Sequence, residues 1–233
     1  MLNLLFDLDG TLTDPRDGIA RSINYALGKF NVPLRDTVFL EQFIGPPLRE
    51  TFRVLLDTED DEVLTQAIVL YRERYLVEGY TENNVYSGVS ELLSTCRESG
   101  HRLFVATYKR QDIAVSVLSH FQLSSFFDAI YGCDLDLTKT ALLTQLLKEQ
   151  SLTPASCLMI GDRKGDIEAG RNNGISTAGV LWGYGSKEEL TAASPDYLAQ
   201  TPSDLFSIIR LNSHSPTLWQ ASLQDTPRTS SKQ

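Results

Sequence analysis

The stretch Leu2-Asn3-Leu4-Leu5-Phe6-Asp7-Leu8-Asp9-Gly10-Thr11 decides how this chain folds. A short apolar run stops abruptly at two aspartates with one residue between them, and a glycine follows. Such a run is typical of a strand that is buried on both faces and ends in a loop. We therefore expect a buried strand of a parallel sheet that presents Asp7 and Asp9 where it ends.

Two further apolar runs have the same form. Residues 103–106 end at Thr107, and residues 157–160 end at Gly161-Asp162. Stripes of apolar residues at helical spacing separate these runs, and residues 175–181 predict one more strand. Strands that alternate with helices predict an α/β fold, a doubly wound parallel sheet with crossover helices on both faces.

The segment between the first two strands differs from the rest. It carries helix patterns at 17–30, 48–56 and 62–76 and no convincing strand pattern. We expect residues 15–84 to form an α-helical insert, and residues 1–14 together with 85–211 to form the core domain. Residues 212–233 are rich in Ser, Thr, Gln and Pro, which predicts a disordered tail.

Composition excludes several classes of protein. The chain has 233 residues and a formal net charge of −9, which disfavours binding to nucleic acid or to an anionic membrane. Its three cysteines include no CxxC pair, which fits a reducing compartment. The apolar run at the N-terminus is too short for a signal peptide or a membrane span. We expect a cytoplasmic protein, a monomer or homodimer, whose partner is a small metabolite.

The residues that follow the strands carry the chemistry. In an open parallel sheet, ligands bind outside the carboxyl ends of the strands. The residues expected there are Asp7, Asp9, Thr107 and Asp162, with Asp166 one helical turn further on and Lys139 in a loop before the helix at Leu142. Carboxylates gathered in a cleft repel each other, and a hard dication such as Mg²⁺ relieves this repulsion. A hydroxyl and an ammonium added to this group can bind a phosphoryl group.

Taken singly, these residues have simpler explanations. Asp162 and Asp166 can be carboxylates that complement a helix N-terminus, Thr107 a strand-end hydroxyl and Lys139 a surface lysine. Their order along the chain is more informative. Asp7-Leu8-Asp9-Gly10-Thr11-Leu12-Thr13-Asp14, then Thr107, Lys139 and Gly161-Asp162-Arg163-Lys164-Gly165-Asp166 resemble the four motifs of the haloacid-dehalogenase (HAD) superfamily.

Later residues narrow the resemblance. Ala169-Gly170-Arg171-Asn172-Asn173-Gly174 and Gly179-Val180-Leu181-Trp182-Gly183-Tyr184-Gly185 resemble the phosphoglycolate-phosphatase-like branch. One departure is Tyr108-Lys109-Arg110 after the second motif, where many relatives have Ser-Lys-Pro. Because Tyr108 replaces a small residue beside Thr107, we expect it to alter the wall of the pocket.

The resemblance implies roles for these residues. Asp7 would attack phosphorus and form an aspartyl phosphate, and Asp9 would act as general acid and then as general base. Mg²⁺ would be held by Asp7, the main-chain carbonyl of Asp9 and Asp162, with Asp166 as a direct or outer partner. Thr107 and Lys139 would bind the phosphoryl group.

The resemblance also implies a helical cap that chooses the substrate. Within the loop Gly45-Pro46-Pro47-Leu48-Arg49, Arg49 is a candidate for binding a second anionic group of the substrate. The alternative, to which we give equal weight, is that Arg49 is an arginine on the protein surface without a binding role. The expected function is a Mg²⁺-dependent phosphatase that acts on phosphoglycolate, a nucleoside monophosphate or a sugar phosphate. A sugar phosphomutase and a non-catalytic HAD-like regulatory protein are the alternatives.

Overall fold

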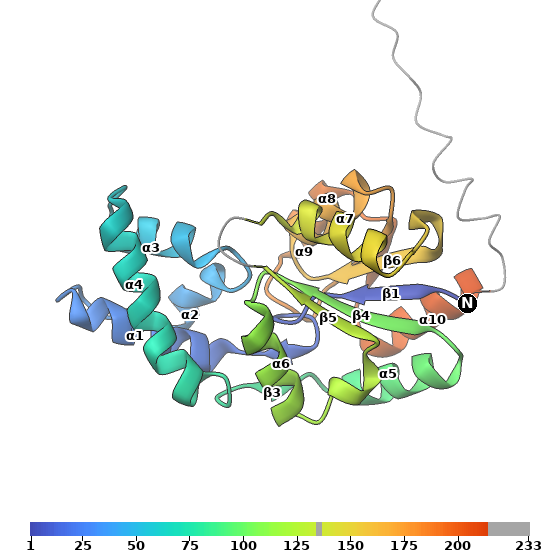
Figure 1. Ribbon diagram of the computed structural model, residues 1–233, viewed down its shortest axis with the longest axis horizontal. Helices are drawn as coiled ribbons and strands as arrows, with labels where there is room; N and C mark the ends of the chain where they lie inside the picture. The colour runs from blue at the N-terminus through green and yellow to red at the C-terminus, as the bar shows by residue number, and fades with distance from the viewer. Residues whose placement is uncertain (134–136, 214–233) are drawn as a thin grey trace, which may run out of the picture.

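The fold is built around a six-stranded sheet, seen in a computed structural model that describes residues 1–133 and 137–213 (Figure 1). The strand order is β5-β4-β1-β6-β7-β8, and every neighbouring pair is parallel. The strands are β1 (Asn3–Phe6), β4 (Arg102–Thr107), β5 (Ala129–Gly132), β6 (Cys157–Gly161), β7 (Ser176–Val180) and β8 (Tyr197–Ala199). The chain winds outward from β1 in both directions, so the predicted doubly wound sheet is confirmed.

Side chains of β1 alternate between two apolar layers, as strand geometry requires. Leu4 and Phe6 pack with α5 (Val89–Glu98), α6 (Gln111–His120) and α10 (Pro202–Ser213) on one face. Leu5 packs on the other face with α7 (Lys139–Glu149) and α8 (Lys164–Asn172). The helix α9 (Lys187–Ala193) packs against α8 beside this second layer. Figure 1 shows helices above and below the sheet, which leaves its strand ends as the accessible edge.

Between β1 and β4 the chain forms a group of helices beside the sheet (Figure 1). These are α1 (Arg16–Lys29), α2 (Thr37–Leu40), α3 (Leu48–Leu56), α4 (Asp61–Arg74), a short 3₁₀ turn Glu41–Phe43 and a π-helical turn Tyr75–Gly79. The predicted helix at 48–56 is found unchanged. Two short antiparallel strands, β2 (Thr13–Asp14) and β3 (Asn84–Val85), pair where the chain leaves for this group and returns. The sequence patterns did not predict them.

The π-helical turn packs closely against α1. A Cβ atom on Gly18 would lie 1.9 Å from the carbonyl oxygen of Gly79, so only glycine permits this approach. The Gly18 amide donates a hydrogen bond to the Glu82 carbonyl at 3.0 Å. Arg21 and Arg74 both form ion pairs with Glu82, at 2.6 and 2.8 Å. These contacts fix the place of Tyr75, the first residue of the turn.

Two boundaries differ from the sequence expectation. Lys139 is the first residue of α7 and does not lie in a loop, because the Thr138 side chain accepts a hydrogen bond from the Ala141 amide and caps the helix there. Helix α10 continues to Ser213, two residues into the predicted tail, and Asn212 accepts a hydrogen bond from Tyr197 Oη at 3.0 Å. The rest of that predicted tail, 214–233, lies outside the described residues.

A membrane-spanning helix needs about 20 mostly apolar residues. Within residues 1–133 and 137–213, no helix has both the length and the apolar content that crossing a bilayer requires.

Candidate active site

Three adjacent strands deliver the first side chains of the site. Asp7 follows β1, Thr107 ends β4 and Asp162 follows β6. Because β4 and β6 flank β1, the carboxyl ends of these strands meet at one edge of the sheet. All three side chains are buried. The sequence prediction that these residues gather at one place is therefore met by the topology.

The loop after β1 folds back tightly over Asp162. The Leu8 carbonyl accepts hydrogen bonds from the amides of Leu12 and Thr13, at 2.9 and 3.1 Å. Gly10 has a φ of +85°, and a Cβ atom at this position would lie 2.2 Å from Asp162 Oδ2. Glycine is thus required for both the backbone conformation and the close approach. The turn also brings the Thr11 hydroxyl within 3.2 Å of Asp162 Oδ1, to which it donates a hydrogen bond.

Lys139 lies between two of the carboxylates. Its Nζ is 2.8 Å from Asp7 Oδ1 and forms an ion pair with Asp166 Oδ1. All three residues are buried. Burial alone would lower the pKa of Lys139, but the charges of Asp166 and Asp7 outweigh it and raise that pKa above its ordinary value. The ammonium is therefore charged and neutralises part of the carboxylate cluster.

Asp7, Asp162 and Asp166 can together hold a cation. One carboxylate oxygen from each lies within 4.8 Å of those of the other two. With Lys139 included, the ionised group carries a net charge of −2, from three carboxylates and one ammonium. Burial in such a group is unfavourable unless a cation compensates the charge.

The uncompensated negative charge of this cluster is clearest at Asp162. Its side chain accepts hydrogen bonds from Thr11 and from the Tyr184 amide, and it forms no ion pair among the described residues. Burial, followed by the charges of Asp166 and Asp7, raises the pKa of Asp162 to about 8. Oxygen donors of this kind suit a hard divalent cation such as Mg²⁺.

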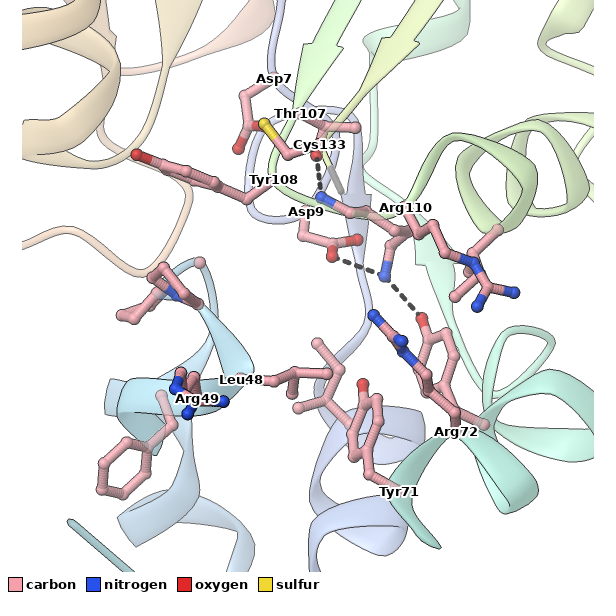
Figure 2. Close-up of a pocket in the computed structure, with 18 of the residues that line it drawn as sticks. Asp7, Asp9, Leu48, Arg49, Tyr71, Arg72, Thr107, Tyr108, Arg110 and Cys133 are labelled. Atoms are coloured by element: carbon pink, nitrogen blue, oxygen red, sulfur yellow. Dashed lines mark hydrogen bonds and ion pairs between the residues drawn. The ribbon is translucent and has the colours of Figure 1, made fainter. Parts of the chain in front are cut away.

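The carboxylate of Asp9 stands apart from this group. Lys109 Nζ lies 2.7 Å from Asp9 Oδ2 (Figure 2, dashed line). The other oxygen, Oδ1, is buried and has no hydrogen-bond partner among the described residues. Burial raises the pKa of Asp9, and the Lys109 ammonium partly offsets this rise. Metal binding by Asp9, which was predicted through its main-chain carbonyl, stays a prediction.

A cavity of about 130 Å³ lies between the strand ends and the helical insert (Figure 2). From the sheet side it is lined by Asp7, Asp9, Thr107, Tyr108 and Lys109. The insert contributes residues 45–49 and the side chains of Phe43, Tyr71, Arg72 and Tyr75. The segment that was predicted to meet the substrate therefore faces the cavity, but only residues 45–47 form a loop, because Leu48 and Arg49 begin α3. Tyr108 forms part of the cavity wall.

Several residues of this cavity were not singled out from the sequence. Lys109 reaches both Asp9 and the Tyr75 hydroxyl, the latter at 2.9 Å, and Tyr71 stacks on the Tyr75 ring. Arg72 follows Tyr71 on α4 and also lines the cavity. Arg49 lines the cavity as well, but its guanidinium forms an ion pair with Asp61. Its predicted contact with a second anionic group of the substrate stays a prediction.

The fold and the site together define a class. A doubly wound sheet with a buried acidic cluster, a buried lysine and a cavity at the strand ends is the arrangement of an α/β protein that binds its ligand at the carboxyl edge of the sheet. The model of the haloacid dehalogenase-like hydrolase family matches residues 4–180. The chain therefore belongs to this family, and the resemblance found in its motifs is confirmed.

Comparison with individual proteins agrees with the family. The chain is 43% identical to a 5'-nucleotidase of Pseudomonas aeruginosa, over 84% of this chain and 89% of the relative. It is 35% identical to the tyrosine-protein kinase PtkA of Mycobacterium tuberculosis, over 82% of this chain and 66% of that protein. The crystal structure of a predicted phosphatase from Clostridium acetobutylicum matches with a TM-score of 0.86 and 37% identity, over 91% and 99% of the two chains.

Proposed function

We propose that the chain is a Mg²⁺-dependent phosphatase that hydrolyses a small phosphomonoester through an aspartyl phosphate on Asp7. The observation that carries the proposal is that Asp7, which pairs with Lys139, lines the same cavity as Asp9 and Thr107. The names of the relatives support phosphoryl chemistry, since one is a 5'-nucleotidase and another structure is described as a predicted phosphatase.

In the first step, a carboxylate oxygen of Asp7 attacks the phosphorus atom of the ester. The bond between phosphorus and the ester oxygen breaks, and a proton from Asp9 goes to the departing alkoxide. Burial raises the pKa of Asp9, so the protonation that this step requires costs less than it would for an exposed carboxyl. Thr107 and the amides of the loop after Asp7 bind the phosphoryl oxygens, and Lys139 balances their charge.

In the second step, water attacks the phosphorus atom of the aspartyl phosphate. Asp9, now ionised, takes a proton from this water, and the bond between phosphorus and the Asp7 oxygen breaks. Inorganic phosphate leaves and Asp7 returns to its carboxylate form. Lys109 lies beside Asp9 and stabilises the ionised form that acts as the base here.

The metal fits the donor set described above. Asp7 and Asp162 would hold Mg²⁺, with Asp166 as a direct or outer partner and the main-chain carbonyl of Asp9 as a further donor. When bound, the ion supplies positive charge that neutralises the transferring phosphoryl oxygens. Asp166 already forms an ion pair with Lys139, so its main role in this proposal is to position the Lys139 ammonium.

We assign residues 15–84 as a cap domain and residues 1–14 with 85–211 as the core domain. The cap closes the cavity, so that phosphoryl transfer takes place away from bulk water. Substrate choice then comes from cap residues that contact the rest of the ester, with Arg49 as the candidate for a second anion. Phosphoglycolate, nucleoside monophosphates and sugar phosphates are the substrate classes to be compared.

One experiment tests the proposal directly. Release of inorganic phosphate from 4-nitrophenyl phosphate and from a panel of phosphorylated metabolites is measured with Mg²⁺ and with a chelator. We expect turnover that requires Mg²⁺ and that disappears in Asp7→Asn. Transfer to a second hydroxyl of a sugar phosphate without phosphate release would instead identify a phosphomutase. A protein that binds metabolites without turnover would identify a non-catalytic regulator.

A further inference from the structure

We infer that Lys109 is a positioning residue that couples the helical insert to the carboxylate of Asp9. It holds Asp9 in its working position while Tyr75 of the insert contacts the same ammonium. This inference rests on the proposed function, since it concerns how the proposed general acid is held. It goes beyond that function because neither Lys109 nor Tyr75 has a role in the proposed chemical steps as bond-making groups.

The first observation is the contact on the Asp9 side. Lys109 Nζ is 2.7 Å from Asp9 Oδ2, and the side chains are only 7% and 12% exposed. A buried ion pair has fixed geometry, because each charge loses much if its partner moves away. The pair uses one oxygen of Asp9 and leaves Oδ1, which no other described residue engages through a hydrogen bond. Asp9 is thus oriented with one oxygen kept for the proton transfer.

The second observation is the contact on the insert side. The same ammonium donates a hydrogen bond to Tyr75 Oη at 2.9 Å and lies 4.6 Å from the centre of the Tyr75 ring. Tyr71 stacks on that ring, with centroids 5.3 Å apart and an angle of 12° between planes. Both tyrosines are buried. The insert therefore presents a rigid aromatic acceptor to Lys109.

The third observation is the place of these residues in the chain. Lys109 lies two residues after Thr107 at the end of β4, and its amide donates a hydrogen bond to the Thr107 hydroxyl at 3.2 Å. Asp9 lies in the loop after β1, whereas Tyr75 begins the π-helical turn that Gly18 and Gly79 fasten to α1. One ammonium thus joins two loops of the sheet edge to the insert. Figure 2 draws the ion pair of Asp9 as a dashed line from the labelled carboxylate.

The physical consequence is a dependence of Asp9 on the insert. With Tyr75 in contact, water is excluded from the Lys109 ammonium and the pull of that ammonium on Asp9 is strong, because the local dielectric constant is low. If the insert moves away, water replaces Tyr75, and the ion pair weakens through solvation. The general acid is then held firmly only when the cavity is covered.

The test compares two esters of similar shape, benzyl phosphate and 4-nitrophenyl phosphate. The benzyl alkoxide needs a proton to leave, and the nitrophenolate does not, so the ratio of their kcat/KM values reports on the general acid. Asp9→Asn gives the reference and should lower the benzyl to nitrophenyl ratio by about 100-fold, the lower end of general-acid effects. Because one enzyme preparation serves both esters, any loss of folded protein cancels in the ratio.

We expect Lys109→Met to lower the same ratio by about tenfold, the size of couplings between contacting residues. Tyr75→Phe, which removes only the hydroxyl, should lower it by about threefold. In Lys109→Met/Tyr75→Phe the second change should add nothing, because both act through one ammonium. The matched control is Arg110→Met, which removes the neighbouring cavity-lining cation that pairs with Asp112, and it should leave the ratio unchanged.

The outcomes separate the two proposals. If Asp9→Asn leaves the ratio unchanged, or if the wild type hydrolyses neither ester, the proposed function fails. If Asp9→Asn lowers the ratio while Lys109→Met weakens both esters equally, Lys109 binds phosphate or supports the fold, and the inference is overturned. If Lys109→Met lowers the ratio and Tyr75→Phe does not, the coupling to the insert is overturned.

Discussion

Lys139 Nζ lies 2.8 Å from Asp7 Oδ1, and both residues are almost completely withdrawn from water. Asp7 follows the central strand, and Lys139 opens helix α7 on one face of the sheet. The buried ammonium also pairs with Asp166. It is therefore the internal counter-charge of the acidic cluster, and the behaviour of this cluster toward substitution, metal and pH follows from it.

Lys139→Met should destabilise the fold as well as stop turnover. The variant keeps the volume of the side chain but leaves Asp7 and Asp166 buried without their cation, which typically costs about 3–5 kcal/mol. The free energy of unfolding in urea measures the loss. Lys148→Met removes an exposed lysine from the same helix and should change stability by no more than about 0.5 kcal/mol. Equal losses in both variants would contradict the role of Lys139 as counter-charge.

Asp7→Asn should abolish phosphate release and leave the fold intact. An amide does not attack phosphorus usefully, but it fills the same space and removes one of three clustered carboxylates. The melting temperature should stay the same or rise, as is common when an active-site carboxylate is neutralised. Retention of about a tenth of the wild-type kcat, in protein purified free of wild type, would show that Asp7 is not the nucleophile.

Mg²⁺ should raise the melting temperature of the wild type, because it binds the folded cluster and not the unfolded chain. At a concentration about 100 times its Kd, the ion should add about 2.7 kcal/mol. Asp162→Ala should remove most of this shift. Asp61→Ala removes a carboxylate whose side chain is 83% exposed and should keep the shift. A full shift in Asp162→Ala would place the metal elsewhere.

Metal-free protein should lose stability as the pH rises. Asp162 has a folded-state pKa of about 8 and an ordinary value of 3.8, and Asp166 has a folded-state pKa of about 6. Between the unfolded-state pKa and the folded-state pKa of each carboxyl, the folded protein holds a proton that the unfolded chain has released. The contribution of each carboxyl to the free energy of unfolding is therefore fully present below its unfolded-state pKa. It is lost as the pH rises through the folded-state pKa, by at most about 1.4 kcal/mol per pH unit per proton.

Urea unfolding in a chelator, at about pH 5.5 and about pH 8, measures this dependence. Asp162→Asn serves as the comparison, because the amide does not titrate, and its stability should vary less with pH than that of the wild type. Mg²⁺ should stabilise the wild type more at the higher pH, where the carboxylates bind it without releasing protons. A pH dependence that is identical in the wild type and the variant would show that Asp162 is already ionised in the folded state.

The sequence predicted the parts of the fold that have strong local patterns. Apolar runs ending at Asp7, Thr107 and Asp162 predicted three strand ends at one edge of the sheet, because parallel strands place their carboxyl ends there. That the three strands are neighbours is seen only in the structure. Strand β8 was not predicted, since it has three residues and a mixed pattern of burial. Strands β2 and β3 have two residues each and are defined by their pairing, which no local pattern carries.

The missed parts of the site depend on contacts between distant segments. Lys109 stands next to a quoted motif, but its partners Asp9 and Tyr75 come from two other parts of the chain. Only the folding of the insert back over the sheet edge brings Tyr75 there. The start of α7 was within reach, because Thr138 before a helical stripe is a typical N-cap, and this signal would have placed Lys139 on the helix.

The last prediction concerns Arg49, which faces the cavity while its guanidinium pairs with Asp61. The side chain of Asp61 is largely exposed, so this pair is weak and solvent-screened. A substrate carboxylate inside the covered cavity would compete for the guanidinium under less screening. Arg49→Ala should then lower kcat/KM on a phosphate ester that bears a carboxylate. Expressed as a free energy of activation, the loss should be about 1.5–3 kcal/mol, the range for a hydrogen bond to a charged group.

Asp61→Asn supplies the opposite change, because it removes the competitor and leaves Arg49 in place. It should raise kcat/KM on the carboxylate-bearing ester by an amount that corresponds to about 0.5 kcal/mol in the free energy of activation, the size of an exposed ion pair. In the double variant, Arg49→Ala should cancel this gain. Benzyl phosphate, which lacks the second anion, should respond little to either change. Equal losses on both esters in Arg49→Ala would instead assign Arg49 to the packing of α3 against α4, and no loss on either would leave it as a surface arginine. Either result would transfer substrate choice to other residues of the cavity wall, beginning with Arg72 and Tyr108.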